Sequence, residues 1–307
     1  MIFKRKLICL AVGFSLTSLI TGKSFAADEI YIPLVSKGFQ HQFWQAVKQG
    51  ADQAGKDLKV KVTFEGPETE AMVDKQIDML SSSLAKKPSA IGFAALDSQA
   101  AIPLLKKAQA AKIPVVAFDS GVDSDIPVTT ATTDNKAAAA LIGKAGDVAL
   151  VVHDQTSRTG VDRRDGFVDR IKSTYPNIKI VSVQYGGGDQ LKSTEITKSI
   201  LQANPNIKGI FGANEGSAIG VLNGAKEMKR SIVIIGYDSG KQQKEAVRSG
   251  AMAGAITQNP VGIGYKTVEA AVKALKGEKL PKIIDTGFYF YDKSNIDDPK
   301  IAAVLYD

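Results

Sequence analysis

The sequence predicts an α/β protein in which two similar lobes each contain a parallel β-sheet. Strand-like and helix-like segments alternate along most of the 307 residues, which is typical of βαβ units in open sheets. Most strand-like segments are apolar on successive residues, as parallel strands buried on both faces are. Two short motifs from the first half of the chain recur in the second half, and a chain of this length suggests about two domains.

Nine segments are expected to form strands. In chain order they are 29–35, 60–65, 90–95, 113–119, 147–153, 178–185, 207–214, 231–238 and 252–258. Helical patterns separate them, and in 43–58 a single apolar stripe is formed by Phe43, Val47, Ala51, Ala54 and Leu58. Asp97 and Asp189 each stand just before such a pattern and are expected to be helix N-caps.

The internal repeat places two acidic residues in matched positions. IPVVAFDSG (113–121) resembles SIVIIGYDSG (231–240), and GFAALDSQA (92–100) resembles IFGANEGSA (210–218). Asp119 and Asp238 therefore each follow a strand, at the carboxyl edge where open α/β sheets bind ligands. An Asp before Ser-Gly can also serve only to shape a turn. The matched pair favours a functional role.

The first 26 residues are interpreted as a cleaved secretory signal. MIFKRK is basic, LICLAVGFSLTSLI is a short apolar run, and small residues precede Ala27. The alternative is an uncleaved membrane anchor. Cleavage would remove Lys4, Arg5, Lys6 and Lys23 and lower the formal charge from +7 to +3, so the composition gives no argument for nucleic-acid binding.

Cysteine and histidine usage narrows the chemistry further. Cys9 is the only cysteine and would leave with the signal, so the mature chain is expected to contain no disulfide, thiol nucleophile or cysteine metal site. His41 and His153 are the only histidines, which leaves two candidate bases for a Ser-His-Asp triad. No spacing of acidic and histidine residues resembles a metal site, so neither a metal nor a cofactor is expected.

Polar residues follow several of the predicted strands. HDQTSRTGVDRRDGF (153–167) contains Arg158 and Arg163, whose guanidinium groups suit oxygen ligands. We favour Arg163 over Arg158, although either could contact a ligand. Asn214 and Gln258 end two other strands, and their amides both donate to and accept from hydroxyl groups. The glycine-rich YGGGDQLK (185–192) lacks the spacing of a phosphate-binding loop, which favours a tight turn.

Phe43 and Trp44 are adjacent aromatic residues at the start of a predicted helix. Since a helix buries one stripe, neighbours 100° apart do not both need to be large and aromatic for packing. Aromatic rings cover the C–H faces of a sugar, while Asp, Asn, Gln and Arg side chains hold its hydroxyls. Trp44 is therefore expected to form a wall of a sugar site, with Phe43 in the core stripe. The alternative is that Trp44 only covers the edge of the core.

Six segments together resemble the type I periplasmic sugar-binding proteins of ABC transporters, in the ribose-binding group. They are HQFWQAVKQGA, IPVVAFDSG, RRDGF, GIFGANEGSAIG, VIIGYDSG and AGAITQNPVGIGYK. The resemblance implies two Rossmann-like lobes joined by three crossovers. The parts of the chain that it implies are a signal peptide at 1–26, an N-terminal lobe of 27–130 plus 259–285, and a C-terminal lobe of 131–258 plus 286–307. It also implies a monomeric periplasmic protein, not an enzyme, that delivers a monosaccharide or cyclic polyol to a membrane permease.

The resemblance also assigns residues to the ligand. Phe43 and Trp44 match the aromatic pair that faces the sugar, and Asp119 matches the acidic residue that ends the fourth strand. Asn214, Asp238 and Gln258 match contacts from the second lobe and the hinge. The full set of expected ligand-binding residues is His41, Phe43, Trp44, Asp119, Arg158, Arg163, Asn214, Asp238 and Gln258.

Four features depart from the family pattern. His41 stands in place of an asparagine, Ser120 in place of an arginine, and Gly188 in place of an aromatic residue. The ligand is therefore not expected to be ribose bound in the same way. Among pentoses, hexoses and cyclic polyols, the space at Gly188 favours a six-membered ring or an inositol. The segment 134–146 is shorter than the helix usual in the family, which bears on packing in the second lobe.

Three other functions share features with this sequence. A glycosidase could use Asp119 and Asp238 as acid and base, and a search for product from glycosides would reveal it. A transcription regulator of similar architecture would carry a helix-turn-helix where this chain has the signal-like segment. A role as a chemoreceptor ligand is compatible with transport, and the sequence leaves it open.

Overall fold

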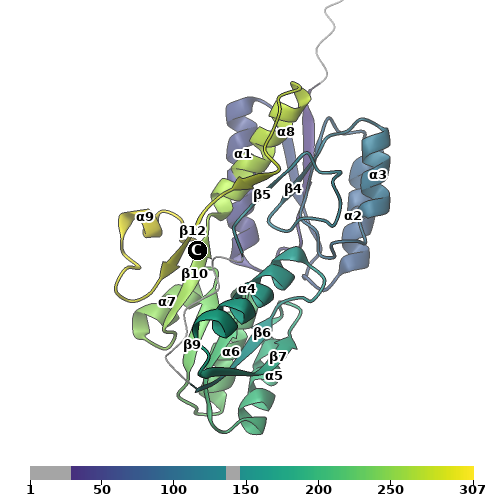
Figure 1. Cartoon of the computed structure of the whole chain (residues 1–307). Coiled ribbons are helices and arrows are strands. Elements are labelled where there is room, and N and C mark those ends of the chain that lie inside the picture. The colour runs from purple at the N-terminus through teal and green to yellow at the C-terminus, as the bar shows by residue number, and fades with distance from the viewer. Residues whose placement is uncertain (1–28, 136–145) are drawn as a thin grey trace, which may run out of the picture.

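The computed structural model describes residues 29–135 and 146–307, which fold into two α/β lobes, shown one above the other in Figure 1. Each lobe contains a six-stranded sheet with helices on both faces, so the predicted fold class is confirmed. The expected signal peptide (1–26) and most of segment 134–146 lie outside the described residues. Among the described helices, none is long and apolar enough to cross a membrane.

The first lobe is an entirely parallel sheet in the order β11-β5-β4-β3-β1-β2. Its strands are β1 (Tyr31–Val35), β2 (Lys61–Glu65), β3 (Ile91–Phe93), β4 (Val115–Phe118), β5 (Thr129–Thr132) and β11 (Ile283–Asp285). Its helices are α1 (Gln42–Leu58), α2 (Val73–Ala85), α3 (Ile102–Ala110) and α8 (Pro260–Leu275). Helices α1 and α8 cover one face, and α2 and α3 cover the other (Figure 1).

The predicted stripe of α1 is buried against the sheet and α8, with only Leu58 partly exposed. The two helices pack so closely that glycine is required at the contact. A Cβ on Gly50 would lie 1.9 Å from the Val261 carbonyl oxygen, and one on Gly264 would lie 1.9 Å from the Val47 carbonyl oxygen. This close packing fixes α1, and with it the two aromatic residues in its first turn.

The second lobe has the strand order β12-β10-β9-β8-β6-β7. Its strands are β6 (Gly146–Val152), β7 (Ile178–Tyr185), β8 (Ile207–Gly212), β9 (Val233–Tyr237), β10 (Gly254–Gln258) and β12 (Phe288–Tyr291). Its helices are α4 (Arg158–Thr174), α5 (Gln190–Ala203), α6 (Glu215–Glu227), α7 (Lys241–Ser249) and α9 (Pro299–Ala302). The β12–β10 pair is antiparallel and the other pairs are parallel. Helices α5, α6 and α7 share one core, and α4 packs on the opposite face.

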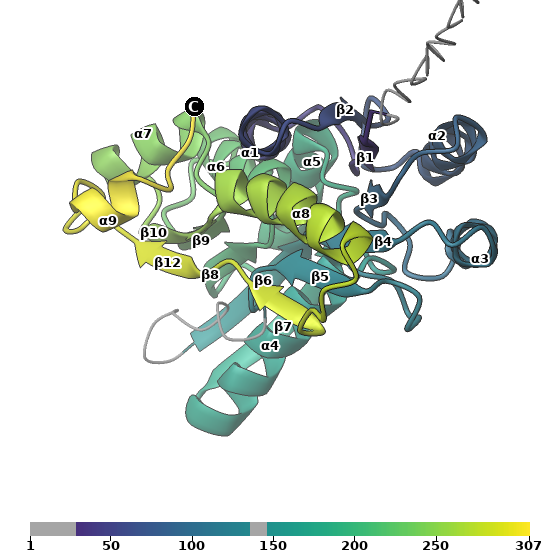
Figure 2. The same ribbon diagram turned by 90° about the horizontal axis from the view of Figure 1, so that it is seen from above.

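The chain passes between the two sheets three times. It leaves the first sheet after β5, returns after β10, and crosses once more in the short link between β11 and β12. In the view from above, β12 lies beside β10 in the second sheet (Figure 2). The carboxyl ends of parallel strands from both sheets face the region between the lobes, which is where ligands bind in open α/β folds.

The nine expected strands are present as β1–β4 and β6–β10, with no end shifted by more than two residues. The strands β5, β11 and β12 were not expected. They are three or four residues long, and β11 and β12 lie at sheet edges. Asp189 caps α5 by accepting from the Lys192 N–H, as predicted. Asp97 does not cap α3; its carboxylate closes the turn ahead of the helix, which begins only at Ile102.

Candidate ligand-binding site

A small cavity lies between the lobes, at the carboxyl ends of the strands. The first lobe lines it with Lys37, His41, Phe43, Trp44, Glu70 and Asp119, and the second lobe with His153, Arg163, Asn214, Asp238 and Gln258. Eight of the nine residues expected from the sequence therefore meet here, and Arg158 does not. Most of the lining is polar or charged, and the aromatic side chains all come from the first lobe.

The two repeated aspartates take equivalent positions directly after β4 and β9. Asp119 has φ 54° and Asp238 has φ 81°, a left-handed backbone that non-glycine residues adopt rarely and at a cost. Asp238 accepts from Gln258 Nε2 at 2.7 Å and from the Glu215 N–H at 3.0 Å. Asp119 Oδ2 forms an ion pair with Lys37 Nζ at 3.2 Å. Among the described residues, none donates a hydrogen bond to this oxygen. The strained turn aims each carboxylate between the lobes.

Arg163 is a buried cation of the second lobe. Its Nε donates to Asn135 Oδ1 at 2.8 Å and its Nη1 donates to the Ala213 carbonyl at 2.9 Å, while the guanidinium stacks 3.7 Å above the Tyr237 ring. Burial raises the pKa of the Tyr237 phenol well above its usual value, so Tyr237 stays neutral and donates to Asn135. These contacts hold Arg163 at the cavity.

Arg158 is the one expected ligand-binding residue that does not line the cavity. It opens α4, is 42% exposed, and pairs with Asp162 at 3.1 Å and with Asp123 of the first lobe at 3.6 Å. It lies outside the cavity because it is five residues from Arg163 on one helix. Five residues rotate a side chain by about 140° relative to the first, so only one of the two arginines can face the cavity.

The aromatic pair belongs to both the core and the cavity. Trp44 is 1% exposed and packs edge-to-face against Phe43 at 4.9 Å and against Phe118 at 6.3 Å. Its Nε1 donates to Glu70 Oε1 at 2.7 Å, and Lys37 Nζ lies 5.7 Å from its ring centroid. Packing therefore fixes the plane of the indole, and Trp44 also lines the cavity.

The two histidines lie on opposite sides of the cavity. His41 precedes α1, and its Nε2 is 2.9 Å from Gln40 Nε2. His153 directly follows β6, with Nε2 3.1 Å from Thr159 Oγ1. Burial, and then the positive charges of Lys37 and Arg163, lower the pKa of His153 well below its usual value. His153 is thus neutral at physiological pH and offers one donor and one acceptor.

Three lining residues were missed as ligand-binding candidates. Lys37 and His153 follow β1 and β6, so the rule that selected the aspartates could have selected them. Glu70 lies in the loop between β2 and α2, with no strand end or repeat to mark it. Among the described residues, no group of three or more His, Cys, Asp and Glu side chains could hold a metal ion.

The lobes also contact each other directly around the cavity. Lys37 Nζ donates to Thr159 Oγ1 at 3.1 Å, and Gln40 Nε2 donates to the Gly188 carbonyl at 3.3 Å. The Lys241 N–H donates to Gln42 Oε1 at 2.8 Å. Each bond joins one lobe to the other, so the structure represents a closed arrangement of the two lobes.

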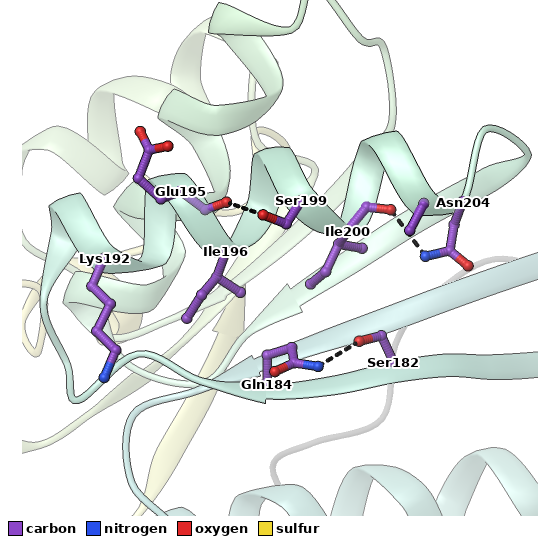
Figure 3. A pocket seen from close by; sticks show the side chains of 9 residues that line it. Ser182, Gln184, Lys192, Glu195, Ile196, Ser199, Ile200 and Asn204 are labelled. Atoms are coloured by element: carbon purple, nitrogen blue, oxygen red, sulfur yellow. Dashed lines mark hydrogen bonds between the residues drawn. The ribbon is translucent and has the colours of Figure 1, made fainter.

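A larger hollow of about 810 Å³ lies on the outside of the second lobe, between β7 and α5 (Figure 3). Its polar side chains bond to near neighbours in sequence: Ser199 to the Glu195 carbonyl, Asn204 to the Ile200 carbonyl, and Gln184 to Ser182. It receives no residue from the first lobe and lies away from the convergent charged groups. The interlobe cavity is therefore the better candidate for a ligand site.

Comparisons with known proteins agree with this architecture. The family model described as "Periplasmic binding protein domain" matches residues 32–279. The D-allose-binding periplasmic protein of Escherichia coli is 28% identical over 280 residues, covering 85% of this chain and 89% of that protein. Among solved structures, an Agrobacterium radiobacter carbohydrate transporter solute-binding protein in complex with D-arabinose is 34% identical with a TM-score of 0.86. That match covers 91% of this chain and all of that one.

A second solved relative, an ABC transporter solute-binding protein from Agrobacterium vitis with bound D-fucose, is also 34% identical. It covers 90% of this chain and 100% of its own, with a TM-score of 0.86. The likeness thus extends over both lobes and across the three crossings between them. The family model covers well over half of the chain, and the chain belongs to the periplasmic binding protein domain family.

Proposed function

We propose that this protein is the solute-binding component of an ABC importer and binds a monosaccharide or cyclic polyol in the interlobe cavity. The observation that carries the proposal is the convergence of an indole, three carboxylates, two cations and two amides on one cavity. An indole offers an apolar wall to sugar C–H groups. Charged and amide groups provide the donors and acceptors that a ring of hydroxyls requires.

The proposal includes a division of labour between the lobes. The first lobe supplies the aromatic wall and the carboxylates of Asp119 and Glu70, and the second lobe supplies Arg163, Asn214 and Asp238. A ligand that touches both lobes stabilises the closed arrangement, because it can contact both halves of the site at once only when the lobes are closed. The moving units are the lobes 27–130 plus 259–285 and 131–258 plus 286–307.

The proposed setting follows from the family. A secretory signal at residues 1–26 would deliver the chain to the periplasm as a monomer, where its partner would be a membrane permease. The proposed role is binding rather than catalysis. Asp238 is held by Gln258 and the Glu215 N–H, and Asp119 by Lys37, which suits hydrogen-bond acceptors fixed in place.

A ligand screen tests the proposal. Purified mature protein would be heated with D-arabinose, D-fucose, D-allose, D-ribose and myo-inositol, since a ligand that binds only the folded state raises the melting temperature. Calorimetry on each positive ligand should give one site per chain, and the ligand should be recovered unchanged. A panel in which no ligand changes the melting temperature would contradict the proposal. Release of product from a glycoside would indicate that the protein is an enzyme rather than a binding protein.

A further inference from the structure

Glu70 is a nearly buried acid that the fold places beside Trp44. Its Oε1 accepts from Trp44 Nε1 at 2.7 Å, and its side chain passes over Gly38, where an added Cβ would lie 3.5 Å from Glu70 Cγ. The residue is 7% exposed and lines the interlobe cavity. One oxygen of the carboxyl group is therefore anchored to the first lobe whether or not the second lobe is close.

The remaining oxygen of Glu70, Oε2, is free to accept a hydrogen bond from a ligand in the cavity that Glu70 lines. Burial alone would raise the pKa of this carboxyl group. The charges of Lys37 and His41 and the Trp44 hydrogen bond outweigh burial, so the pKa falls below its ordinary value. An ionised carboxylate only accepts hydrogen bonds, and none of the described residues donates one to Oε2. A donor from a ligand would complete its coordination.

Gly188 of the second lobe makes room for this oxygen. A Cβ at residue 188 would lie 3.1 Å from Glu70 Oε2, 3.1 Å from Asn214 Nδ2 and 3.4 Å from Gln40 Nε2. Such distances are tighter than ordinary van der Waals contact. The three polar groups come from both lobes and surround the space that any side chain at this position would occupy. Gly188 is thus matched to Glu70 across the interface between the lobes.

We propose that Glu70 is a specificity-determining residue of the sugar site, whose carboxylate accepts a hydrogen bond from one ligand hydroxyl. Trp44 positions the carboxylate, and the missing side chain of Gly188 allows the lobes to close over it. The inference rests on the proposed function and deepens it. It requires a ligand that presents a hydroxyl donor, rather than hydrogen, at the position next to the Trp44 wall.

A cycle between protein and ligand tests this pairing. Affinity would be measured by calorimetry for the best sugar of the screen and for each of its monodeoxy analogues, on wild type and on Glu70→Gln. The amide keeps the shape of the side chain and removes its charge. Wild type should bind one analogue about tenfold or more weakly than the parent sugar, whereas Glu70→Gln should bind that analogue and the parent within about threefold.

Two neighbouring glycines provide a matched control for closure. Gly187 and Gly188 have nearly the same backbone, with φ of 67° and 69°, so alanine strains both equally. A Cβ on Gly187 would meet only the Ala71 Cβ, at 3.9 Å. Gly187→Ala should leave affinity within about twofold of wild type, and Gly188→Ala should weaken it about tenfold or more. In a Glu70→Ala background, the loss caused by Gly188→Ala should be smaller.

The outcomes separate this inference from the proposed function. A wild type that binds no sugar refutes both. A wild type that binds sugar, with a Glu70→Gln variant that discriminates among all analogues as wild type does, overturns the inference alone. A Glu70→Gln variant with a lower melting temperature but unchanged affinities assigns the residue a packing role and also overturns it.

Discussion

Sugar affinity should fall as pH rises, because closure buries the carboxyl group of Glu215. Glu215 opens α6 in the second lobe, next to Asp238. In the closed arrangement it also faces Glu70 and the N–H groups of Phe43 and Gln42 at the start of α1. Burial and then repulsion by Asp238 raise its pKa from 4.5 to about 8, while the two N–H groups offset part of that rise. Opening withdraws the first lobe, so the carboxyl group regains water and its pKa falls toward its ordinary value, although Asp238 stays beside it.

The sign and size of the effect follow from proton linkage. Between pH 4.5 and about 8 the closed protein holds a proton on Glu215 that the open protein releases. Because the pKa is raised in the closed state, protonated Glu215 stabilises closure fully below pH 4.5. This stabilisation decreases as the pH rises and is lost above about pH 8. Each pH unit is worth about 1.4 kcal/mol, so the interval corresponds to at most about 5 kcal/mol, and the dissociation constant rises by up to about tenfold per pH unit.

Calorimetry from pH 5 to pH 9 on wild type and Glu215→Gln isolates this contribution. The amide is neutral at every pH, so the variant should retain tight binding with little pH dependence over this range. Glu245→Gln removes a carboxylate from the exposed face of α7 in the same lobe and should keep the wild-type slope. A wild-type slope in Glu215→Gln, or an affinity that rises with pH in wild type, would refute the reasoning.

Four further results are expected. Asp119→Ala and Asp238→Ala should each weaken sugar binding by about 1.5–3 kcal/mol with the fold retained. Normal affinity of both variants by calorimetry would mean that the repeated aspartates only shape turns. Arg163→Ala should abolish most of the affinity, whereas Arg158→Ala should cost less than about 1 kcal/mol, because its ion pairs are exposed. Small-angle scattering should show a smaller radius of gyration with saturating ligand, and an unchanged profile would contradict hinge closure. Ligand should alter the fluorescence emission of Trp44, the only tryptophan, with saturation at one ligand per chain. Trp44→Ala should weaken ligand binding by about 1–3 kcal/mol. A variant with a lower melting temperature but unchanged affinity would show that Trp44 serves only the core.

Sequence patterns were informative wherever burial alone decides the structure. Interior strands such as β4 and β9 are covered on both faces, so their apolar runs identify them directly. The strand β5 reads Thr-Thr-Ala-Thr and forms only because β4 and β11 pair with it on either side. Its hydrogen bonds come from segments far away in the chain, and no local pattern reports them.

The same distinction applies to the site. Asp119 and Asp238 were found because the topology of parallel sheets predicts where strand ends meet. Glu70 was missed because its place depends on a hydrogen bond to Trp44 across the first lobe. Arg158 was assigned to the site because the sequence gives the spacing of two arginines but not which face of α4 is buried.

Each half of the site is braced within its own lobe, which bears on how a ligand is captured. In the first lobe Trp44 holds Glu70 and Lys37 pairs with Asp119; in the second lobe Gln258 holds Asp238. These bonds do not depend on closure, so the first lobe already presents its wall and its acceptors in the open state. These side chains therefore lose their conformational entropy during folding, and not when the ligand binds. Closure joins the two halves of the site, so a ligand that bonds to both halves favours the closed arrangement, and its affinity depends on how well one molecule fits both.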